Sequence, residues 1–351
     1  MSAALNIDFG SLPNYASPAY PAFYDADVRA QTNIPQGNLP DDRVATLGRV
    51  LFYDRSLSIN GAVSCASCHQ RATGFGDSRR FSLGFSGVEF TGAHSMRLAN
   101  AVFYRAGSAF WDKRATSLEE QASKPLQHPI EMGFEAGKGG IDALVERLRT
   151  KAYYPPLFEL AFGDAALSEE RIKRALAQFE RSIVSFDSKW DRAARQAYVP
   201  GIPGKGLAGD LPGFTAEENR GNALFIKPRE LGGLGCSACH EPPSFALSPN
   251  ARSNGLDAGE TTVFKSPSLK NVGLGTFFMH DGRFSSLEAV VEHYNSGVQA
   301  GPALDSRLTL PGNIPRRLSL SVSDKKALVA FLKTLSDESL QTDPKFADPF
   351  R

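Results

Sequence analysis

Two cysteine pairs, each followed directly by a histidine, are the residues of this chain best suited to chemistry. They hold all four cysteines of the 351-residue sequence, and the residues concerned are Cys65, Cys68, His69, Cys236, Cys239 and His240. Cys-x-x-Cys-His is the attachment signature of c-type haem, in which both thiols add to the vinyl groups of one porphyrin and the histidine ligates the iron. A single copy could be a redox pair or a small disulfide loop, and a zinc ribbon would place its pairs roughly 15–20 residues apart. Two widely separated copies with no cysteine left over predict two covalent haems and no disulfide.

The overall composition indicates a globular protein without a strongly charged surface. The net charge is +1 and 42% of the residues are hydrophobic, which gives no indication of a nucleic-acid or polybasic membrane partner. No apolar run approaches the roughly 18–20 residues of a membrane span. Residues 1–8 lack the basic and apolar regions of a signal peptide. Because haem c is normally attached outside the cytoplasm, we expect a periplasmic protein whose export signal has been removed.

The elements that must position the two motifs are themselves repeated. Gly48-Arg-Val-Leu-Phe52 precedes the first motif as Gly221-Asn-Ala-Leu-Phe225 precedes the second. Apolar periodicity predicts a helix over residues 41–53. We interpret the repeat as a duplicated cytochrome c unit whose opening helix packs near the haem edge, although two unrelated amphipathic helices would give a similar pattern.

Composition also divides the chain into successive stretches. Residues 1–40 are rich in Pro, Tyr and Asn and predict an irregular arm on the surface. Residues 41–197 and 215–351 predict two cytochrome c-like domains, separated by a Pro- and Gly-rich linker at 198–214. Because strand signals are few, we expect a mostly α-helical fold with long loops, in which each domain binds one covalent haem c.

Capping patterns predict where several later helices begin. Ser117, Thr215 and Ser285 are each followed by a glutamate three residues later, the spacing of a capping box. Ser168 predicts the start of a long helix that runs through Phe186, and a last helix is expected over residues 323–335. The apolar stripes of these helices are expected to form core.

Four further segments carry a resemblance to a known family. They are Phe110-Trp-Asp-Lys-Arg-Ala-Thr-Ser-Leu-Glu-Glu-Gln-Ala, Pro125-Leu-Gln-His-Pro-Ile-Glu-Met-Gly, Pro267-Ser-Leu-Lys-Asn-Val and Met279-His-Asp-Gly-Arg. With the two haem motifs, the chain from about residue 41 onward resembles the dihaem bacterial cytochrome c peroxidase and MauG family. The resemblance implies an N-terminal peroxide-reacting haem, a C-terminal electron-transfer haem and a tryptophan between them.

The same resemblance implies roles for individual residues of the first half. His69 would be the proximal ligand of the peroxide-reacting haem, Glu131 its distal acid and Gln121 the neighbour of that acid. Cleavage of peroxide needs such an acid, because a proton must reach the distal oxygen before water can leave. A plainer interpretation of Glu131 is a carboxylate that caps a helix. Trp111 matches the tryptophan between the haems.

The second haem would take His240 on one side and a downstream ligand on the other. The candidates for that ligand are Met279, His280, His293 and Tyr294. Peroxidases of the family carry methionine at the position of Tyr294, whereas MauG-like members carry tyrosine. Helix periodicity supports an inward face made of Leu287, Val290, Val291 and Tyr294, with His293 about 100° away. A phenolate is hard and anionic and stabilises higher iron oxidation states, whereas a thioether raises the potential. Tyr294 is favoured, and His293 or a tyrosine that merely packs remain alternatives.

Two departures from the family pattern lie near the haems. The loop at 82–90 has no histidine, and Phe85 or a neighbour stands where the family's peroxidases have a distal histidine. His94 aligns with an asparagine that the family uses toward calcium, and Gly275 and Phe277 replace residues that supply oxygens there. Backbone carbonyls can still bind calcium, so a calcium ion is possible but doubtful.

The sequence therefore predicts a peroxide-dependent oxidoreductase with two c-type haems. In the favoured, MauG-like interpretation, hydrogen peroxide reacts at the first haem, and the oxidising equivalents are shared with the second and delivered to a protein partner. The first alternative is a conventional cytochrome c peroxidase that takes electrons from a small cytochrome or cupredoxin. The second is a non-catalytic dihaem electron carrier, which the open-pocket residues Gln121, Pro125 and Glu131 disfavour.

Overall fold

The computed structural model describes residues 4–351, and helices form most of its regular structure. The principal helices of the described part are α1 (Ala26–Arg29), α2 (Asp42–Tyr53), α3 (Cys65–Cys68), α4 (Leu118–Gln127), α5 (Gly140–Arg149), α6 (Tyr154–Phe162), α7 (Glu169–Ser182), α8 (Lys189–Ala197), α9 (Ala216–Ile226), α10 (Leu287–Glu292), α11 (Val322–Lys333) and α12 (Ser339–Thr342). Two antiparallel hairpins pair β1 (His240–Glu241) with β2 (Ala246–Leu247) and β3 (Thr309–Leu310) with β4 (Ile314–Pro315). The mostly α-helical fold with long loops is thus confirmed.

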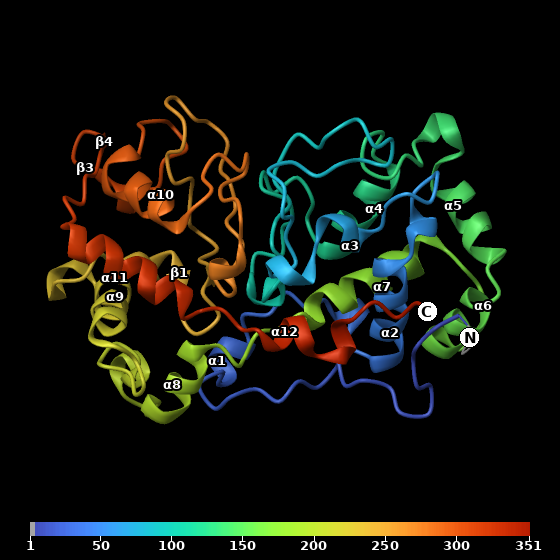
Figure 1. Ribbon diagram of the computed structural model, residues 1–351, viewed down its shortest axis with the longest axis horizontal. Helices are drawn as coiled ribbons and strands as arrows, with labels where there is room; N and C mark the ends of the chain where they lie inside the picture. Colours follow the sequence, from blue (N-terminus) through green and yellow to red (C-terminus); the bar gives the residue numbers. More distant parts are fainter. Residues whose placement is uncertain (1–3) are drawn as a thin grey trace.

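The molecule has two lobes that lie side by side (Figure 1). The first lobe contains α2–α7, and the second contains α8–α11 with the two hairpins. Each lobe has its own hydrophobic core, and each haem motif lies in a different lobe. The two cores therefore give each candidate haem site its own supporting scaffold.

The glycine of the repeated Gly-x-x-Leu-Phe segment lies at a helix crossing in both lobes. A Cβ added at Gly48 of α2 would lie 1.9 Å from the carbonyl oxygen of Ala175 in α7. A Cβ added at Gly221 of α9 would lie 2.0 Å from the carbonyl oxygen of Ala327 in α11. Only glycine permits these approaches. The same residue type therefore sets the spacing of the central helix pair twice.

The phenylalanine of the same segment contacts the motif histidine in both lobes. The ring centroids of Phe52 and His69 are 6.4 Å apart, and those of Phe225 and His240 are 6.3 Å apart. The opening helix of each lobe thus packs on the histidine expected to ligate iron. The duplicated unit predicted from the sequence is present in the structure.

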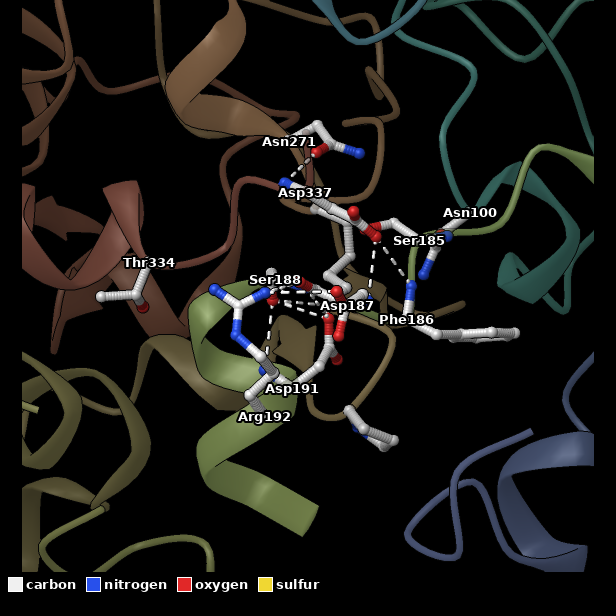
Figure 2. A network of polar contacts seen from close by, with 12 residues as sticks. Asn100, Ser185, Phe186, Asp187, Ser188, Asp191, Arg192, Asn271, Thr334 and Asp337 are labelled. Atoms are coloured by element: carbon white, nitrogen blue, oxygen red, sulfur yellow. Dashed lines mark hydrogen bonds and ion pairs between the residues drawn. The ribbon is translucent and has the colours of Figure 1, made fainter. Parts of the chain in front are cut away.

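A pair of asparagines extends the duplication and joins the lobes. Asn100 and Asn271 both adopt left-handed backbone with φ of 61°. The side-chain oxygen of Asn100 accepts from the amide of Ser185 at 2.7 Å, and that of Asn271 accepts from the amide of Asp337 at 2.7 Å. The Asp337 carboxylate also accepts from the Ser185 hydroxyl at 3.0 Å, as Figure 2 shows. The two copies therefore share one buried polar network.

Both ends of the described chain pack across the lobes. In the N-terminal arm, Tyr15 is buried in the first core, whereas Phe23 and Tyr24 are buried in the second. After α11 the chain returns to the first lobe, where Leu340 and Phe346 are buried in the first core. The arm predicted to lie on the surface thus contributes buried aromatic residues to both lobes.

The helix boundaries agree with the sequence in most places. Helix α2 lies where it was predicted, and α7 begins after Ser168 but ends at Ser182, before Phe186. The predicted cap at Ser285 is wrong by one residue, because the hydroxyl of Ser286 accepts from the amide of Ala289 at 3.1 Å. Phe284, directly before these serines, is held in a β-bridge with Phe278, so the backbone is still extended where the helix was expected to start.

The predicted division of the chain at residues 198–214 stays a prediction. Helix α8 precedes that linker, yet its Trp190 is fully buried in the second core. Among residues 4–351, no helix combines the length and the apolar character that crossing a bilayer requires.

Candidate functional site

His69 directly follows α3 and is oriented as a metal-ligating histidine requires. Its Nδ1 lies 3.0 Å from the carbonyl oxygen of Phe75 and 3.2 Å from the hydroxyl of Ser95. A carbonyl oxygen only accepts, so Nδ1 carries the proton and Nε2 keeps the lone pair that can bind a metal. Burial lowers the pKa of His69, which keeps the ring neutral.

The second motif lines a large, mostly apolar cavity in the second lobe. Cys236, Cys239 and His240 all face it, and none of the four cysteines of the chain forms a disulfide. Burial, with a smaller contribution from the Arg307 charge, lowers the pKa of His240 to about 4. The Nδ1 atom of His240 is buried and has no hydrogen-bond partner within residues 4–351. The imidazole is therefore neutral and beside both thiols, as covalent haem attachment and iron ligation require.

Tyr294 lines the same cavity as His240 and its two cysteines. The cap at Ser286 starts α10, and at His293 the helix widens into a π-helix, His293–Gly297, which carries the tyrosine. Single π-turns are often found at functional sites. Burial raises the pKa of Tyr294 well above its ordinary value, and a hydrogen bond from Asn254 acts in the opposite direction. A positive metal beside the phenol would favour the phenolate further.

The other candidates for the ligand of the second iron occupy different environments. Met279 lines the same cavity, and its sulfur accepts from the side-chain amide of Asn254 at 3.2 Å. The His293 Nε2 lies 3.1 Å from the carbonyl oxygen of Asn254, so this nitrogen is bound to the backbone. The ring of His280 stacks on Phe264 with centroids 3.9 Å apart. Tyr294, Met279 and His280 all line the cavity, and of these three Tyr294 and Met279 contact the side-chain amide of Asn254.

The internal repeat also relates the ligand helices of the two lobes. The segments at 110–114 and 279–283 form equivalent tight turns, in which Phe110 and Met279 both have positive φ, of 66° and 72°. Each turn leads to a capping serine, Ser117 before α4 and Ser286 before α10. In this register, four cavity-lining residues of α10 and the π-helix that follows it correspond to four residues of α4. Leu287, Val290, Val291 and Tyr294 match Leu118, Gln121, Ala122 and Pro125 respectively.

This register gives the first lobe an open ligand position. Pro125 stands where the second lobe has Tyr294, and a proline side chain offers no atom to a metal. Gln121 stands where Val290 faces the second cavity. The placement of Gln121 in a distal pocket stays a prediction.

Glu131 lies on the turn after α4, beside the loop that lacks a distal histidine. The amide of Phe85 donates to the carbonyl oxygens of Ile130 and Glu131 at 3.1 and 3.2 Å. Burial raises the pKa of the Glu131 carboxyl, while the nearby His128 and Arg114 lower it. The carboxyl is therefore more easily protonated than an exposed glutamate and can serve as a proton donor or acceptor.

Trp111 lies at the junction of the two lobes. Its indole Nε1 donates to the carbonyl oxygen of His94 at 2.7 Å, and the side chain lines the second cavity. Its carbonyl oxygen accepts from the amide of Lys265 at 2.6 Å, while the carbonyl oxygen of His280 accepts from the amide of His94 at 2.8 Å. In the repeat, Trp111 corresponds to His280 and His94 to Lys265, so these two contacts between the lobes are reciprocal. They fix the indole at the junction of the lobes, beside the second cavity.

The residues considered for calcium lie beside a buried positive charge. The imidazole Nδ1 of His94 is occupied by the carbonyl oxygen of Arg80 at 3.0 Å. The guanidinium of Arg97 lies beside Gly275, with its Nη1 atom 2.9 Å from where a Cβ of that glycine would be. A positive charge at this point repels a metal cation. Within the described part of the chain, no cluster of three or more His, Cys, Asp or Glu residues could hold a metal ion either.

Comparison with known proteins gives a consistent picture. The sequence profile described as "Di-haem cytochrome c peroxidase" matches residues 42–198. The methylamine utilization protein MauG of Methylorubrum extorquens is 34% identical over 322 residues, which cover 87% of this chain and 81% of that protein. The chain belongs to the di-haem cytochrome c peroxidase family.

Other similar proteins include one that is described as a peroxidase and one that is described as MauG-like. The cytochrome c551 peroxidase of Nitrosomonas europaea is 28% identical and matches 84% of this chain and 80% of its own. A solved structure described as a MauG-like protein associated with microbial copper homeostasis has a TM-score of 0.71 and 29% identity, covering 97% of this chain and 98% of that one. Membership makes the protein a dihaem peroxidase-family enzyme with two haems as cofactors and hydrogen peroxide as substrate.

Sequence reasoning missed two residues of the second cavity. Asn254 has no motif around it, and only the fold brings it to Tyr294 and Met279. Arg97 could have been found by aligning the segment before Asn100 with the segment before Asn271, where serine stands at the equivalent position.

Proposed function

We propose that this protein is a MauG-like member of the family, which uses hydrogen peroxide to oxidise a protein partner in the periplasm. The observation that carries the proposal is that Tyr294 shares the second cavity with Cys236, Cys239 and His240. Haem, once attached, supplies iron that reacts with peroxide at one site and exchanges electrons at the other. An anionic phenolate on the second iron favours its higher oxidation states, which suits a site that stores an oxidising equivalent.

The residues of the first lobe would handle the peroxide and its protons. Glu131, whose pKa is raised by burial, would take a proton from bound peroxide and return it to the distal oxygen, so that water can leave. Gln121 would orient the peroxide from α4. Pro125 leaves the ligand position beside Gln121 without a donor atom, which supports access by a small substrate.

Trp111 would connect the two sites. Its indole is fixed at the lobe junction by the bond to His94 and lines the second cavity. An aromatic ring in this place shortens the electron path between the two haems. The oxidising equivalents could then leave from either lobe to an oxidisable protein side chain.

One observation favours the alternative of a conventional peroxidase supplied by a small redox protein. Met279 lines the same cavity as Tyr294, and its sulfur is positioned by Asn254. A thioether ligand would raise the potential of the second haem and make it an entry point for electrons. The relative from Nitrosomonas europaea is itself described as a cytochrome c551 peroxidase.

The deciding experiment is electron paramagnetic resonance with near-infrared absorption on the oxidised holoprotein, before and after one equivalent of peroxide without an electron donor. We expect one high-spin and one low-spin haem at rest, and after mixing a long-lived signal of oxidation at both sites. The Tyr294→Phe variant should lose the long-lived signal, whereas Met279→Leu should keep it. Two low-spin haems that react only after one is reduced, with Met279→Leu as the damaging variant, would contradict the proposal and support the conventional peroxidase.

A further inference from the structure

A buried arginine at the lobe junction has no partner that explains its charge. Arg97 is 8% exposed, and its Nε atom is buried without a hydrogen-bond acceptor. Across residues 4–351, no carboxylate forms an ion pair with it. Burial lowers its pKa to about 10, with no opposing contribution from an acid. A guanidinium removed from water in this way is costly unless an anion accompanies it.

The internal repeat shows that the fold itself does not require this arginine. Asn100 and Asn271 are equivalent, so Arg97 corresponds to Ser268. Ser268 satisfies its hydroxyl locally, by donating to the carbonyl oxygen of Ser244 at 2.6 Å. A small residue is therefore sufficient for the backbone at this point. The long cation in the first copy must serve something other than the scaffold.

The side chain of Arg97 extends to the second cavity, where its guanidinium forms part of the lining. Its side chain runs past Gly76, where a Cβ would lie 3.0 Å from its Cγ, and reaches Gly275 of the other lobe. The guanidinium carbon lies 5.8 Å from the ring centroid of Phe278. Arg97 and Phe278 both line the cavity that contains Cys236 and His240. Gly76 leaves space for the aliphatic part of the side chain, and Gly275 leaves space for the guanidinium.

A haem bound in this cavity would supply an anion for Arg97. Haem carries two propionate carboxylates, and Cys236, Cys239 and His240 would hold its porphyrin in this cavity. The planar fork of arginine binds a carboxylate through two parallel hydrogen bonds. We propose that Arg97 is the counter-ion of a propionate of the second haem, and that it forms a permanent cation at the junction between the two haem sites.

The proposal has an electrostatic consequence for the second haem. A positive charge held beside the propionate offsets its negative charge and thereby favours the reduced iron. Removing the guanidinium leaves the carboxylate uncompensated in a site of low polarity, which favours the ferric form. It also raises the pKa of the propionate, so that the potential begins to vary with pH.

Spectroelectrochemical titration of the holoprotein tests this, with no peroxide present. For Arg97→Gln we expect the equilibrium constant for reduction of the second haem to fall roughly tenfold, which is a shift of about 59 mV to lower potential. Arg97→Lys keeps the charge without the fork and should lie between the variant and the parent protein. Added calcium or a chelator should leave the parent's potential unchanged.

A matched control is Arg252→Gln, which removes one positive charge from an exposed side chain that lines the same cavity. Because water screens that charge, its shift should be small. A shift in Arg97→Gln no larger than in Arg252→Gln, or a shift in Arg97→Lys as large as in Arg97→Gln, would overturn the assignment. If Arg97→Gln fails to fold, Arg97→Lys still decides, because it should lower the potential more than Arg252→Gln does. The outcome is independent of which partner the enzyme oxidises.

Discussion

Helices α4 and α10 begin in the same way and then carry different side chains at equivalent positions. Each follows a tight turn and a capping serine, and at the same distance from that serine the first carries Pro125 and the second Tyr294. The first lobe thus has no ligating atom where the second has a phenol. One scaffold is thus used twice with a different side chain at this position, which in the proposed function leaves the first site open to substrate and gives the second a ligand.

The other differences between the lobes are also changes of side chain at equivalent backbone positions. Trp111 replaces the His280 of the second copy at the junction, and Arg97 replaces Ser268. Where α11 has Leu332, which lines the second cavity, α7 has Glu180. The backbone features, such as the crossing glycines and the left-handed asparagines, are shared. The shared residues hold the fold, and the unshared ones are the candidates for function.

The largest effect is expected when the phenol of the second lobe is introduced at the equivalent position of the first lobe. Pro125→Tyr places a phenol in the first lobe at the position of Tyr294, and we expect it to bind the first iron. The high-spin signal should disappear and the reaction with peroxide should fall by at least roughly a thousandfold, since an occupied position excludes the substrate. Stopped-flow absorption and electron paramagnetic resonance measure both effects. Pro125→Ala separates the loss of proline from the gain of a ligand and should keep most of the reaction.

The next effect concerns the acid that only the first lobe needs. Glu131→Gln keeps the shape but cannot carry the proton, so peroxide reduction should slow by roughly 10²–10⁴. The rate of the first step after mixing with peroxide is the measurement. Glu135→Gln, at a half-buried glutamate paired with Lys138, removes the same charge four residues later and should change little. Equal losses in both variants would show that Glu131 acts only through its charge.

Because both lobes have a glycine at the central helix crossing, replacing it by alanine should lower the free energy of unfolding by a similar amount in each lobe. In Gly48→Ala and Gly221→Ala, the new methyl group would overlap a carbonyl oxygen of the partner helix. Overpacking of this kind typically costs about 1–3 kcal/mol of the free energy of unfolding. Denaturant titration should place both variants well below the parent and close to each other. Gly37→Ala, whose added methyl meets nothing within 4 Å, is the control. Damage in only one lobe would mean that the crossings are not equivalent.

The last effect is a pH dependence that originates in the first lobe. Burial raises the pKa of Glu180 from 4.5 to about 8, with Arg181 acting in the opposite direction. Between these values the folded chain binds more protons than the unfolded chain, so its free energy of unfolding falls as pH rises, by at most roughly 1.4 kcal/mol per pH unit. Glu180→Gln should flatten this decline, whereas Glu170→Gln, at an exposed position of the same helix, should not. An unchanged decline in Glu180→Gln would assign it to other groups.

Much of this comparison could be predicted from the sequence. The haem motifs and the Gly-x-x-Leu-Phe repeat are local patterns with a direct physical meaning. Helix periodicity placed Tyr294 on the cavity face, because i, i+3, i+4 and i+7 share one side of any helix. These features depend on residues close together in the chain.

The remaining features depend on contacts between distant segments. The start of α10 moved from Ser285 to Ser286 because Phe284 pairs with Phe278. Asn254 reaches Tyr294 only through the fold, and no local pattern indicates it. The charge of Arg97 became notable only once its burial and its lack of a partner were known. Burial of a charge is a tertiary property that composition does not record.

The return of the chain after α11 has a consequence for biosynthesis. Leu340 and Phe346 complete the core of the first lobe, Arg71 donates to the carbonyl oxygens of residues 340, 341 and 343, and Leu5 pairs with Phe350. Because a polypeptide emerges from its amino end, the core of the first lobe cannot be completed until the second lobe has been made.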